Sequence, residues 1–268
     1  MKIYNFFCAI IIALSCSQAS LAGNLQTINS LALTDGNAFG NPNQKEAFNN
    51  FTEYPLSKKA SVGGTMQLTH INSDYHNNTQ RYALNSTEIF HRYKILSFDK
   101  LGVTMQNTYK FSGVFNDNKN LALQPAQDDY ELRFLFAHNM PDRLVNTVVH
   151  GGTPYFARAE IAYRQRFSNP FNEIRFAFWG GVNLSSKFML LAQDNIAWNV
   201  QSKATSASTN SPYTNIQPSK SANNIATLSL IYRCDKDMAI QFGYIDRIAG
   251  NAPFYDGRGV IIGLWNSF

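Results

Sequence analysis

Hydrophobic and polar residues alternate along most of this chain. The clearest window is 155–167, where charged residues hold alternate positions and the positions between them carry mostly Tyr, Ala, Ile and Phe. A period of two indicates a β-strand with one polar and one apolar face. The windows 130–136 and 173–178 show the same pattern. The charged residues on the polar faces of the three windows are Glu131, Arg133, Arg158, Glu160, Arg164, Arg166, Glu173 and Arg175.

The alternating segments are long for β-strands. The best of them run for about 9 to 13 residues, whereas ordinary strands have about 5–6 and tilted membrane-spanning strands about 9–11. The pattern therefore predicts an all-β fold, an antiparallel transmembrane β-barrel of about 10–12 strands. Lys94, Met189 and Leu191 blur the alternation in two of the segments. The predicted strands are 61–72, 81–95, 100–112, 129–138, 154–167, 172–183, 187–199, 223–234, 237–247 and 257–268.

The connections between these segments differ in length. Those near 97–100, 184–187 and 234–237 are short, and those at 113–128 and 201–222 are long. Bacterial barrels keep short turns on the periplasmic side and long loops outside. If the last strand ends in the periplasm, the three short connections fall on the periplasmic side and the two long loops fall outside, as this rule requires.

Two segments do not fit this scheme. The connection 139–153 is long but falls on the periplasmic side, so it is either a plug-like or docked segment or a pair of strands that the pattern misses. Residues 23–59 precede the first clear strand and form either an N-terminal extension or an extra strand. The barrel itself is expected over 60–268.

Residues 1–22 have the features of a cleavable secretory signal peptide. They have a lysine at position 2, continue with an apolar run and end in Ser-Leu-Ala, a small-x-small cleavage site. Lipidation of Cys16 is the competing interpretation, although the residues before it match the lipidation pattern poorly. Cleavage would remove two of the three cysteines and leave Cys234, so the exported chain would form no intramolecular disulfide.

Composition excludes several classes of protein. After the signal, no apolar run approaches the roughly 18 residues of a transmembrane helix. The formal charge of +5 is mild, and no basic run with interleaved aromatics indicates a nucleic-acid partner. Aromatic residues make up 13% of the chain, which favours aromatic girdles at the two membrane interfaces. The expected girdle residues are Tyr155, Phe167, Phe171, Tyr244 and Trp265.

The C-terminal segment 260–268 ends in Phe268, with apolar residues at alternate positions before it. This segment resembles the closing strand of Gram-negative outer-membrane barrels, although Asn266 stands where an apolar or aromatic residue is usual. The resemblance implies that Phe268 is part of the signal read by the barrel-assembly machinery, and that the protein lies in the lipid of the cell outer membrane. The charged block 130–175 is also similar to a pattern in small uncharacterised proteobacterial barrel proteins, which implies no particular activity.

The eight charged residues of the three windows have two interpretations. A charge on the lipid-facing surface costs about 2–4 kcal/mol at mid-membrane, so these side chains are expected to line the lumen. Three carboxylates and five guanidiniums form either an ion-pair lattice that fills a narrow barrel or the wall of a passive small-solute pore. In the pore, the excess of two arginines would favour anions.

Other functions have less support in the sequence. No nucleophile elbow, phosphate loop or metal-ligand spacing is present, so we expect no enzymatic activity, no cofactor and no metal. Adhesion through the long loops stays open, as does a secreted, soluble β-barrel binding protein. We expect a monomeric outer-membrane barrel that is structural or acts as a passive pore. The histidines weighed as enzymatic candidates are His70, His76, His91, His138 and His150.

Overall fold

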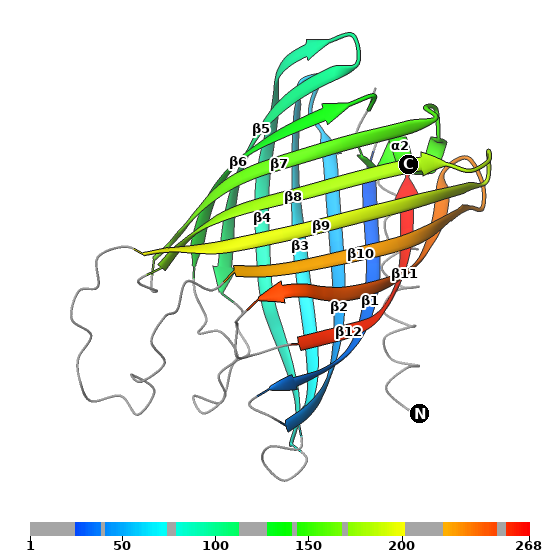
Figure 1. The fold of residues 1–268 in the computed structure, drawn as a ribbon. Coiled ribbons are helices and arrows are strands. Elements are labelled where there is room, and N and C mark those ends of the chain that lie inside the picture. The colour runs from blue at the N-terminus through cyan, green and yellow to red at the C-terminus, as the bar shows by residue number, and fades with distance from the viewer. Residues whose placement is uncertain are drawn as a thin grey trace.

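The computed structural model shows one closed, antiparallel β-barrel (Figure 1). It describes residues 25–38, 41–73, 79–112, 128–140, 144–167, 171–201, 222–250 and 256–268. The predicted antiparallel barrel of 10–12 strands is confirmed with twelve strands. The expected signal peptide lies outside the described residues.

Each strand pairs with its neighbour in the sequence, and one short helix interrupts the series. The elements are β1 (Gln26–Ala38), β2 (Asn41–Pro55), β3 (Ala60–Ser73), β4 (Thr79–Phe98), β5 (Leu101–Ser112), β6 (Asp129–His138), α2 (Leu144–His150), β7 (Tyr155–Arg166), β8 (Phe171–Asn183), β9 (Phe188–Gln201), β10 (Ala222–Arg233), β11 (Met238–Gly250) and β12 (Asp256–Ser267).

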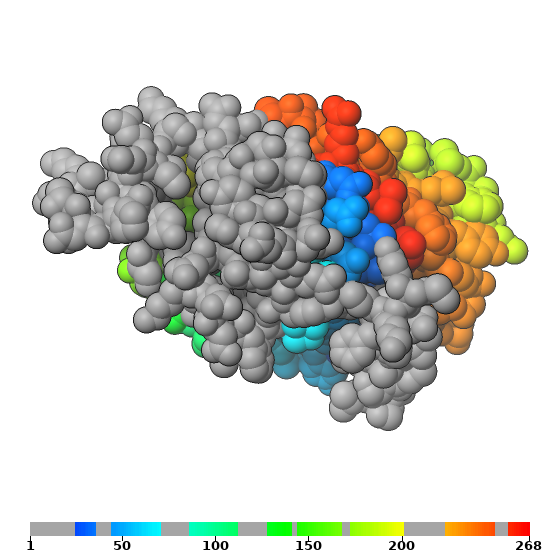
Figure 2. Space-filling view, turned by 90° about the horizontal axis from the view of Figure 1, so that it is seen from below, coloured from blue at the N-terminus to red at the C-terminus, as the bar shows by residue number. Residues whose placement is uncertain are grey.

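The first and last strands close the barrel. Register runs from Gln26 opposite Ser267 to Asn37 opposite Asp256, and Figure 2 shows β1 in blue beside β12 in red. Residues 26–55 thus supply two barrel strands, β1 and β2, in the segment that the sequence left open as an extension or an extra strand. The barrel therefore begins at β1 and not at residue 60.

The two ends of the barrel differ. The turns 56–59, 99–100, 184–187 and 234–237 lie at the end where β1 begins and β12 finishes, which we call the short-turn end. The segment with α2 joins β6 to β7 at this same end. The opposite end, the long-loop end, carries the predicted loops 113–128 and 201–222, which fall almost wholly outside the described residues.

The two faces of the sheet differ in polarity. On β7, Tyr155, Ile161 and Tyr163 are 41–47% exposed, whereas Arg158 and Arg164 on the alternate positions are 6% exposed. The sheet thus turns large apolar side chains outward and charged side chains inward. Other exposed apolar side chains of the strands include Ile89, Phe136, Phe178, Leu190, Trp198, Leu228, Phe242 and Ile262. The described residues contain no helix that is long and apolar enough to cross a membrane.

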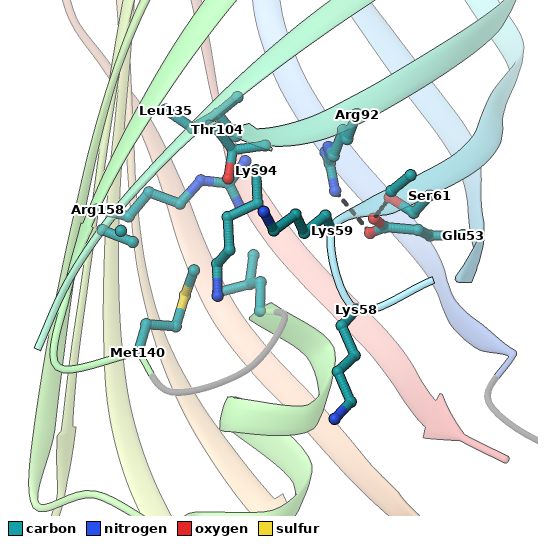
Figure 3. A pocket seen from close by; sticks show the side chains of 14 residues that line it. Glu53, Lys58, Lys59, Ser61, Arg92, Lys94, Thr104, Leu135, Met140 and Arg158 are labelled. Atoms are coloured by element: carbon teal, nitrogen blue, oxygen red, sulfur yellow. Dashed lines mark hydrogen bonds and ion pairs between the residues drawn. The ribbon is translucent and has the colours of Figure 1, made fainter. Parts of the chain in front are cut away.

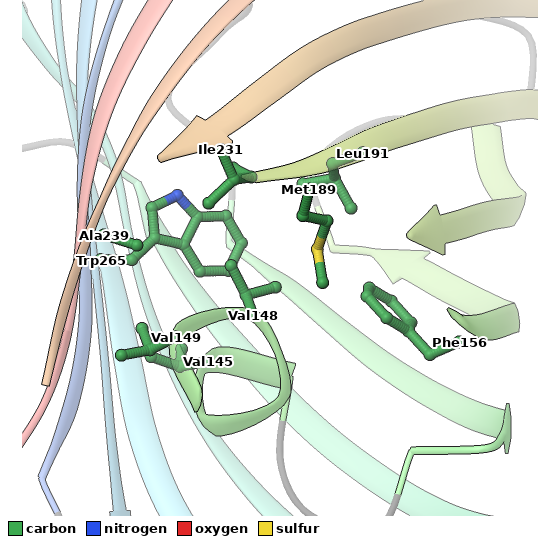
Figure 4. Packing of buried hydrophobic residues seen from close by; sticks show 9 residues of the cluster. All are labelled: Val145, Val148, Val149, Phe156, Met189, Leu191, Ile231, Ala239 and Trp265. Carbon is green, nitrogen blue, oxygen red and sulfur yellow. The ribbon is translucent and has the colours of Figure 1, made fainter. Parts of the chain in front are cut away.

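Helix α2 lies inside the short-turn end of the barrel (Figure 4). Its valines are poor helix formers, but Val145, Val148 and Val149 fall at helical spacing and form one fully buried face. Burial of this face therefore stabilises the helix. It packs on the inner faces of β1, β10, β11 and β12, and Met189 and Leu191 of β9 belong to the same buried cluster. The strand residues in the same buried cluster are Phe156, Met189, Leu191, Ile231, Ala239 and Trp265.

This docked helix corrects one expectation about the girdles. Tyr155, Phe167 and Tyr244 are exposed on the outer face, at 47–54%, and the side chain of Phe171 lies outside the described residues. Trp265, in contrast, is 1% exposed and belongs to the interior cluster. It has the parity of Gln241 and Ala239, which point inward beside it, so it contacts α2 and not a membrane interface.

Candidate functional site

Six of the eight charged residues singled out from the sequence form a connected ion-pair network on the inner faces of β6, β7 and β8, whereas the other two, Arg166 and Glu173, pair with each other. Glu131 is its centre. Its Oε2 lies 2.9 Å from Arg164 Nε and 3.1 Å from Arg175 Nη1, and its Oε1 accepts from Arg133. Glu131 is 2% exposed, so three arginines surround one buried carboxylate. This arrangement offsets the desolvation of each charge.

A second carboxylate extends the network toward the short-turn end. Glu160 on β7 pairs with Arg133 of β6 through one oxygen, and its Oε1 lies 2.5 Å from Arg158 Nη2. At the long-loop end of the same strands, Arg166 pairs with Glu173 of β8. The network therefore follows the strands along much of the barrel interior.

Several members of this network were missed by the sequence analysis. Glu88 and Asp129 each approach Arg164, at 3.4 and 3.7 Å, and Lys110 lies 3.7 Å from Asp129. Glu53 and Arg92 add a further pair. Within these pairs, six carboxylates face seven cations. The excess of two positive charges counted from the eight predicted residues becomes an excess of one in this enlarged set.

The pair between Glu53 and Arg92 is held from several sides. Arg92 Nη1 donates to Glu53 Oε2 at 2.6 Å, and its Nε donates to Gln106 Oε1 at 2.6 Å. The other oxygen of Glu53 accepts from the hydroxyl of Ser61. The Arg92 guanidinium also lies 4.6 Å from the centre of the Phe90 ring, a cation–π contact.

Arg233 attaches α2 to the barrel wall. Its Nε donates to the carbonyl of Val148 at 2.7 Å, and its Nη2 donates to Asn183 Oδ1. The helix ends at once after this contact, because Gly151 adopts a left-handed φ of 66° and its N–H donates to Thr147 O at 3.1 Å. A buried arginine therefore satisfies a carbonyl at the helix end that would otherwise lack a partner.

Helix α2 fills only part of the short-turn end. Between it and the wall formed by β2 to β7 lies a cavity of about 110 Å³, drawn in Figure 3. Its charged lining consists of one carboxylate and five cations. These residues are Glu53, Lys58, Lys59, Arg92, Lys94 and Arg158. The cavity beside the helix is therefore strongly basic.

The enzymatic candidates do not come together. His70 pairs with Glu46, at 3.4 Å, whereas His138 stacks on Tyr155, and His76 lies outside the described residues. Over the described ranges no group of three His, Cys, Asp or Glu side chains is placed to hold a metal ion. The charged network and the basic cavity are thus the candidate sites.

Comparison with known proteins supports the fold. No family model and no curated protein sequence matches the chain. Among solved structures, it is similar to the COG4313 outer membrane channel from Pseudomonas putida F1, with a TM-score of 0.62 and 10% identity over 92% of this chain and 96% of that one. It is also similar to the translocator domain of the autotransporter NalP from Neisseria meningitidis, with a TM-score of 0.50 and 10% identity over 99% and 96%.

A third similar structure is the NanC porin, with a TM-score of 0.50 and 13% identity over 89% of this chain and 100% of that one. At these identities the similarity concerns the fold. The chain therefore has the fold of bacterial outer-membrane β-barrels.

Proposed function

We propose that this protein is an exported outer-membrane β-barrel that acts as a narrow passive pore for small solutes. The observation that carries the proposal is the combination of a closed sheet, an apolar outer face and a charged inner face. A soluble barrel that binds an apolar ligand has the opposite arrangement, with an apolar interior and a polar surface. The apolar outer face and the charged inner face thus favour the membrane barrel over the secreted binding protein.

The orientation follows from the lengths of the connections. The short-turn end, where β12 finishes, is periplasmic in this proposal, and the long-loop end faces outward. Phe268 is the C-terminal assembly signal, and its N–H donates to Leu25 O at 2.8 Å across the seam between the first and last strands. We expect the folded barrel to be a monomer surrounded by outer-membrane lipid.

The charged network reduces the width of the pore. Ion pairs that cross the interior take space from the lumen, and α2 blocks part of the short-turn end. The lattice and the pore, which the sequence presented as alternatives, are combined in this proposal: the lattice narrows the barrel, and small solutes pass through the space that remains. Arg133 and Arg175, which are partly exposed beside the buried Glu131 and Glu160, line that passage.

Two measurements test the proposal in sequence. The outer-membrane fraction of expressing cells is run on a denaturing gel with and without boiling, because an intact barrel stays compact until it is heated. The purified protein is then inserted into planar bilayers, where we expect small, stepwise conductance. A soluble protein without a heat-dependent shift would contradict the location, and a heat-modifiable barrel without conductance would contradict the pore alone.

A further inference from the structure

We propose that the basic cavity at the short-turn end binds a small organic carboxylate. The cavity is the gap described above between α2 and the wall of β2 to β7. Binding itself depends only on the cavity. The role we give it, as the last site that an anionic solute meets before the periplasm, rests on the proposed pore.

The cations of the cavity are available to a ligand. Lys59 and Lys94 are brought together by the hydrogen bond from Lys94 N to Lys59 O, at 2.7 Å. Across the part of the chain that the structure describes, no carboxylate lies within ion-pairing distance of either ammonium. Figure 3 shows their side chains beside that of Arg158, whereas Lys58 extends away from the group.

Arg158 gives the cavity a buried donor that lacks a partner. The residue is 6% exposed, and its Nη2 is bound by Glu160. Its Nε, however, is buried and has no hydrogen-bond partner in the structure. A buried charged N–H group without an acceptor is costly, so an anionic oxygen in the cavity would satisfy it.

The carboxylate in the lining does not compensate these charges. Glu53 is engaged by Arg92 at 2.6 Å and by the hydroxyl of Ser61. The two carboxylates beside the cavity, Glu53 and Glu160, are thus already paired with arginines, and Lys59 and Lys94 add positive charge that neither of them pairs. This combination of clustered cations and one unpaired buried donor is the chemistry that binds an oxyanion.

The other side of the cavity selects among anions. Leu135 and Ala137 of β6 form an apolar wall, continued by Met140 and by Leu144 of α2. A volume of about 110 Å³ holds an ion of several heavy atoms, since one water takes roughly 30 Å³ in the liquid. A short aliphatic carboxylate fits both sides, with its oxygens toward the cations and its chain toward the apolar wall. Inorganic phosphate can contact the cations but has no aliphatic chain to place against the apolar wall.

Lysine footprinting tests the site without any need for conductance. The purified, heat-modifiable barrel is acetylated slowly in detergent, once in sodium butyrate and once in sodium chloride at the same ionic strength. Mass spectrometry gives the acetylation rate at each lysine. At a few times Kd, we expect butyrate to slow acetylation of Lys59 and Lys94 by about threefold or more. Lys100 and Lys187, exposed lysines at the same end and outside the cavity, are the matched controls.

Two variants connect the protection to the cavity. Arg158→Gln removes the unpaired donor. The Kd for butyrate, read from the protection of Lys59 and Lys94, is therefore expected to rise about tenfold. If that variant does not form a heat-modifiable barrel, Lys59→Gln replaces it, with protection of Lys94 as the readout. Lys100→Gln, with the same change of charge, is expected to leave protection unchanged.

Each result decides the proposal. Equal acetylation rates in butyrate and chloride would overturn the site, whether or not the protein conducts. Equal protection by inorganic phosphate and butyrate would overturn the assignment to an organic carboxylate. Selective protection by butyrate in a protein without conductance would support the site and contradict only its role in passage.

Discussion

Arg164 on β7 reaches Glu88 on β4 across the barrel interior, with Nη2 3.4 Å from Oε1, although β5 and β6 separate the two strands in the sheet. The same guanidinium binds Glu131 at 2.9 Å through Nε. One side chain therefore connects carboxylates on β4 and β6. It limits how far these walls can move apart, and so helps to fix the width of the barrel.

The first prediction concerns ion preference. In Arg164→Ser/Arg166→Ser, the carboxylates of Glu131 and Glu173 each lose a cation, so the preference for cations should increase. Glu131→Gln should shift it toward anions. Reversal potentials in a KCl gradient across planar bilayers measure both changes, with Arg258→Ser, on the exposed outer face, as the control. Unchanged ion preference in both variants would contradict a lumen lined by these residues.

The second prediction concerns stability. Glu131→Gln leaves Arg133, Arg164 and Arg175 without their shared buried carboxylate, which should lower the free energy of unfolding by about 3 kcal/mol. The exposed pair of Asp246 and Arg258, at 3.3 Å, should matter much less, by at most about 1 kcal/mol in Asp246→Asn. Urea unfolding in phospholipid vesicles compares the two. Similar losses in both variants would show that the buried network is not a special source of stability.

The third prediction concerns α2. Arg233→Ala removes the donor to Val148 O and the contact with Asn183, so the helix should leave its site more often. Gly151→Ala should act in the same direction. Its Cβ would lie 2.5 Å from the Arg233 guanidinium carbon, and its positive φ disfavours alanine by about 1–2 kcal/mol.

Single-channel conductance and the rate of proteolysis within 139–154 measure release of the helix, and both should rise. Lys236→Ala, at an exposed position of the same end, is the control. Higher proteolysis without higher conductance would mean that α2 is detachable but does not limit the pore.

The fourth prediction concerns the different surroundings of two tryptophans. Trp198 is 47% exposed on the outer face, and Trp265 is 1% exposed, with its Nε1 donating to Gln241 Oε1 at 2.9 Å. Brominated acyl chains should therefore quench a variant that keeps only Trp198 and leave a variant that keeps only Trp265 nearly unaffected. Strong quenching of Trp265 would place it at the lipid boundary and contradict the interior cluster.

The fifth prediction uses Cys234, which lies in the turn between β10 and β11. Burial raises the pKa of its thiol, and the Asp235 carboxylate raises it further. A maleimide reacts with the thiolate, so labelling should be slower than for an ordinary cysteine at pH 8 and should accelerate as the pH rises. Asp235→Asn should increase the rate at pH 8.

The same thiol reports the orientation of the barrel. In intact cells Cys234 should react only with reagents that cross the outer membrane. Arg258→Cys in a Cys234→Ser background, toward the long-loop end, should react with impermeant reagents as well. The reverse pattern would invert the orientation that we propose.

The alternation of polar and apolar residues was sufficient to predict the barrel because the outer face is apolar and most of the inner face is polar. It was blurred where the inner face is itself apolar. Met189 and Leu191 point inward onto α2 and are fully buried, so strand β9 has apolar residues on both faces. The periodicity of one strand contains no information about a helix that docks against it.

Local irregularities explain other differences between the prediction and the structure. Strand β4 has two register shifts, one between Leu84 and Ser86 and one between Lys94 and Leu96, and an extra residue in one strand reverses the parity of those that follow. Glu88 and Arg92 lie between the two shifts, so no single parity along the segment indicated their inward position. Glu53 was missed because 23–59 was not recognised as strands, and its partner Arg92 is distant in the sequence.

The seam between β1 and β12 joins the two most distant strands of the chain, with Gln26 opposite Ser267. Closing so large a loop has an entropic cost, and the seam cannot form before the C-terminal strand has been synthesised. A chain that stops before β12 would keep two unpaired edges, on β1 and on β11, and unpaired edges template association with other chains. Completion of the last strand is thus the step that converts an aggregation-prone sheet into a molecule without edges.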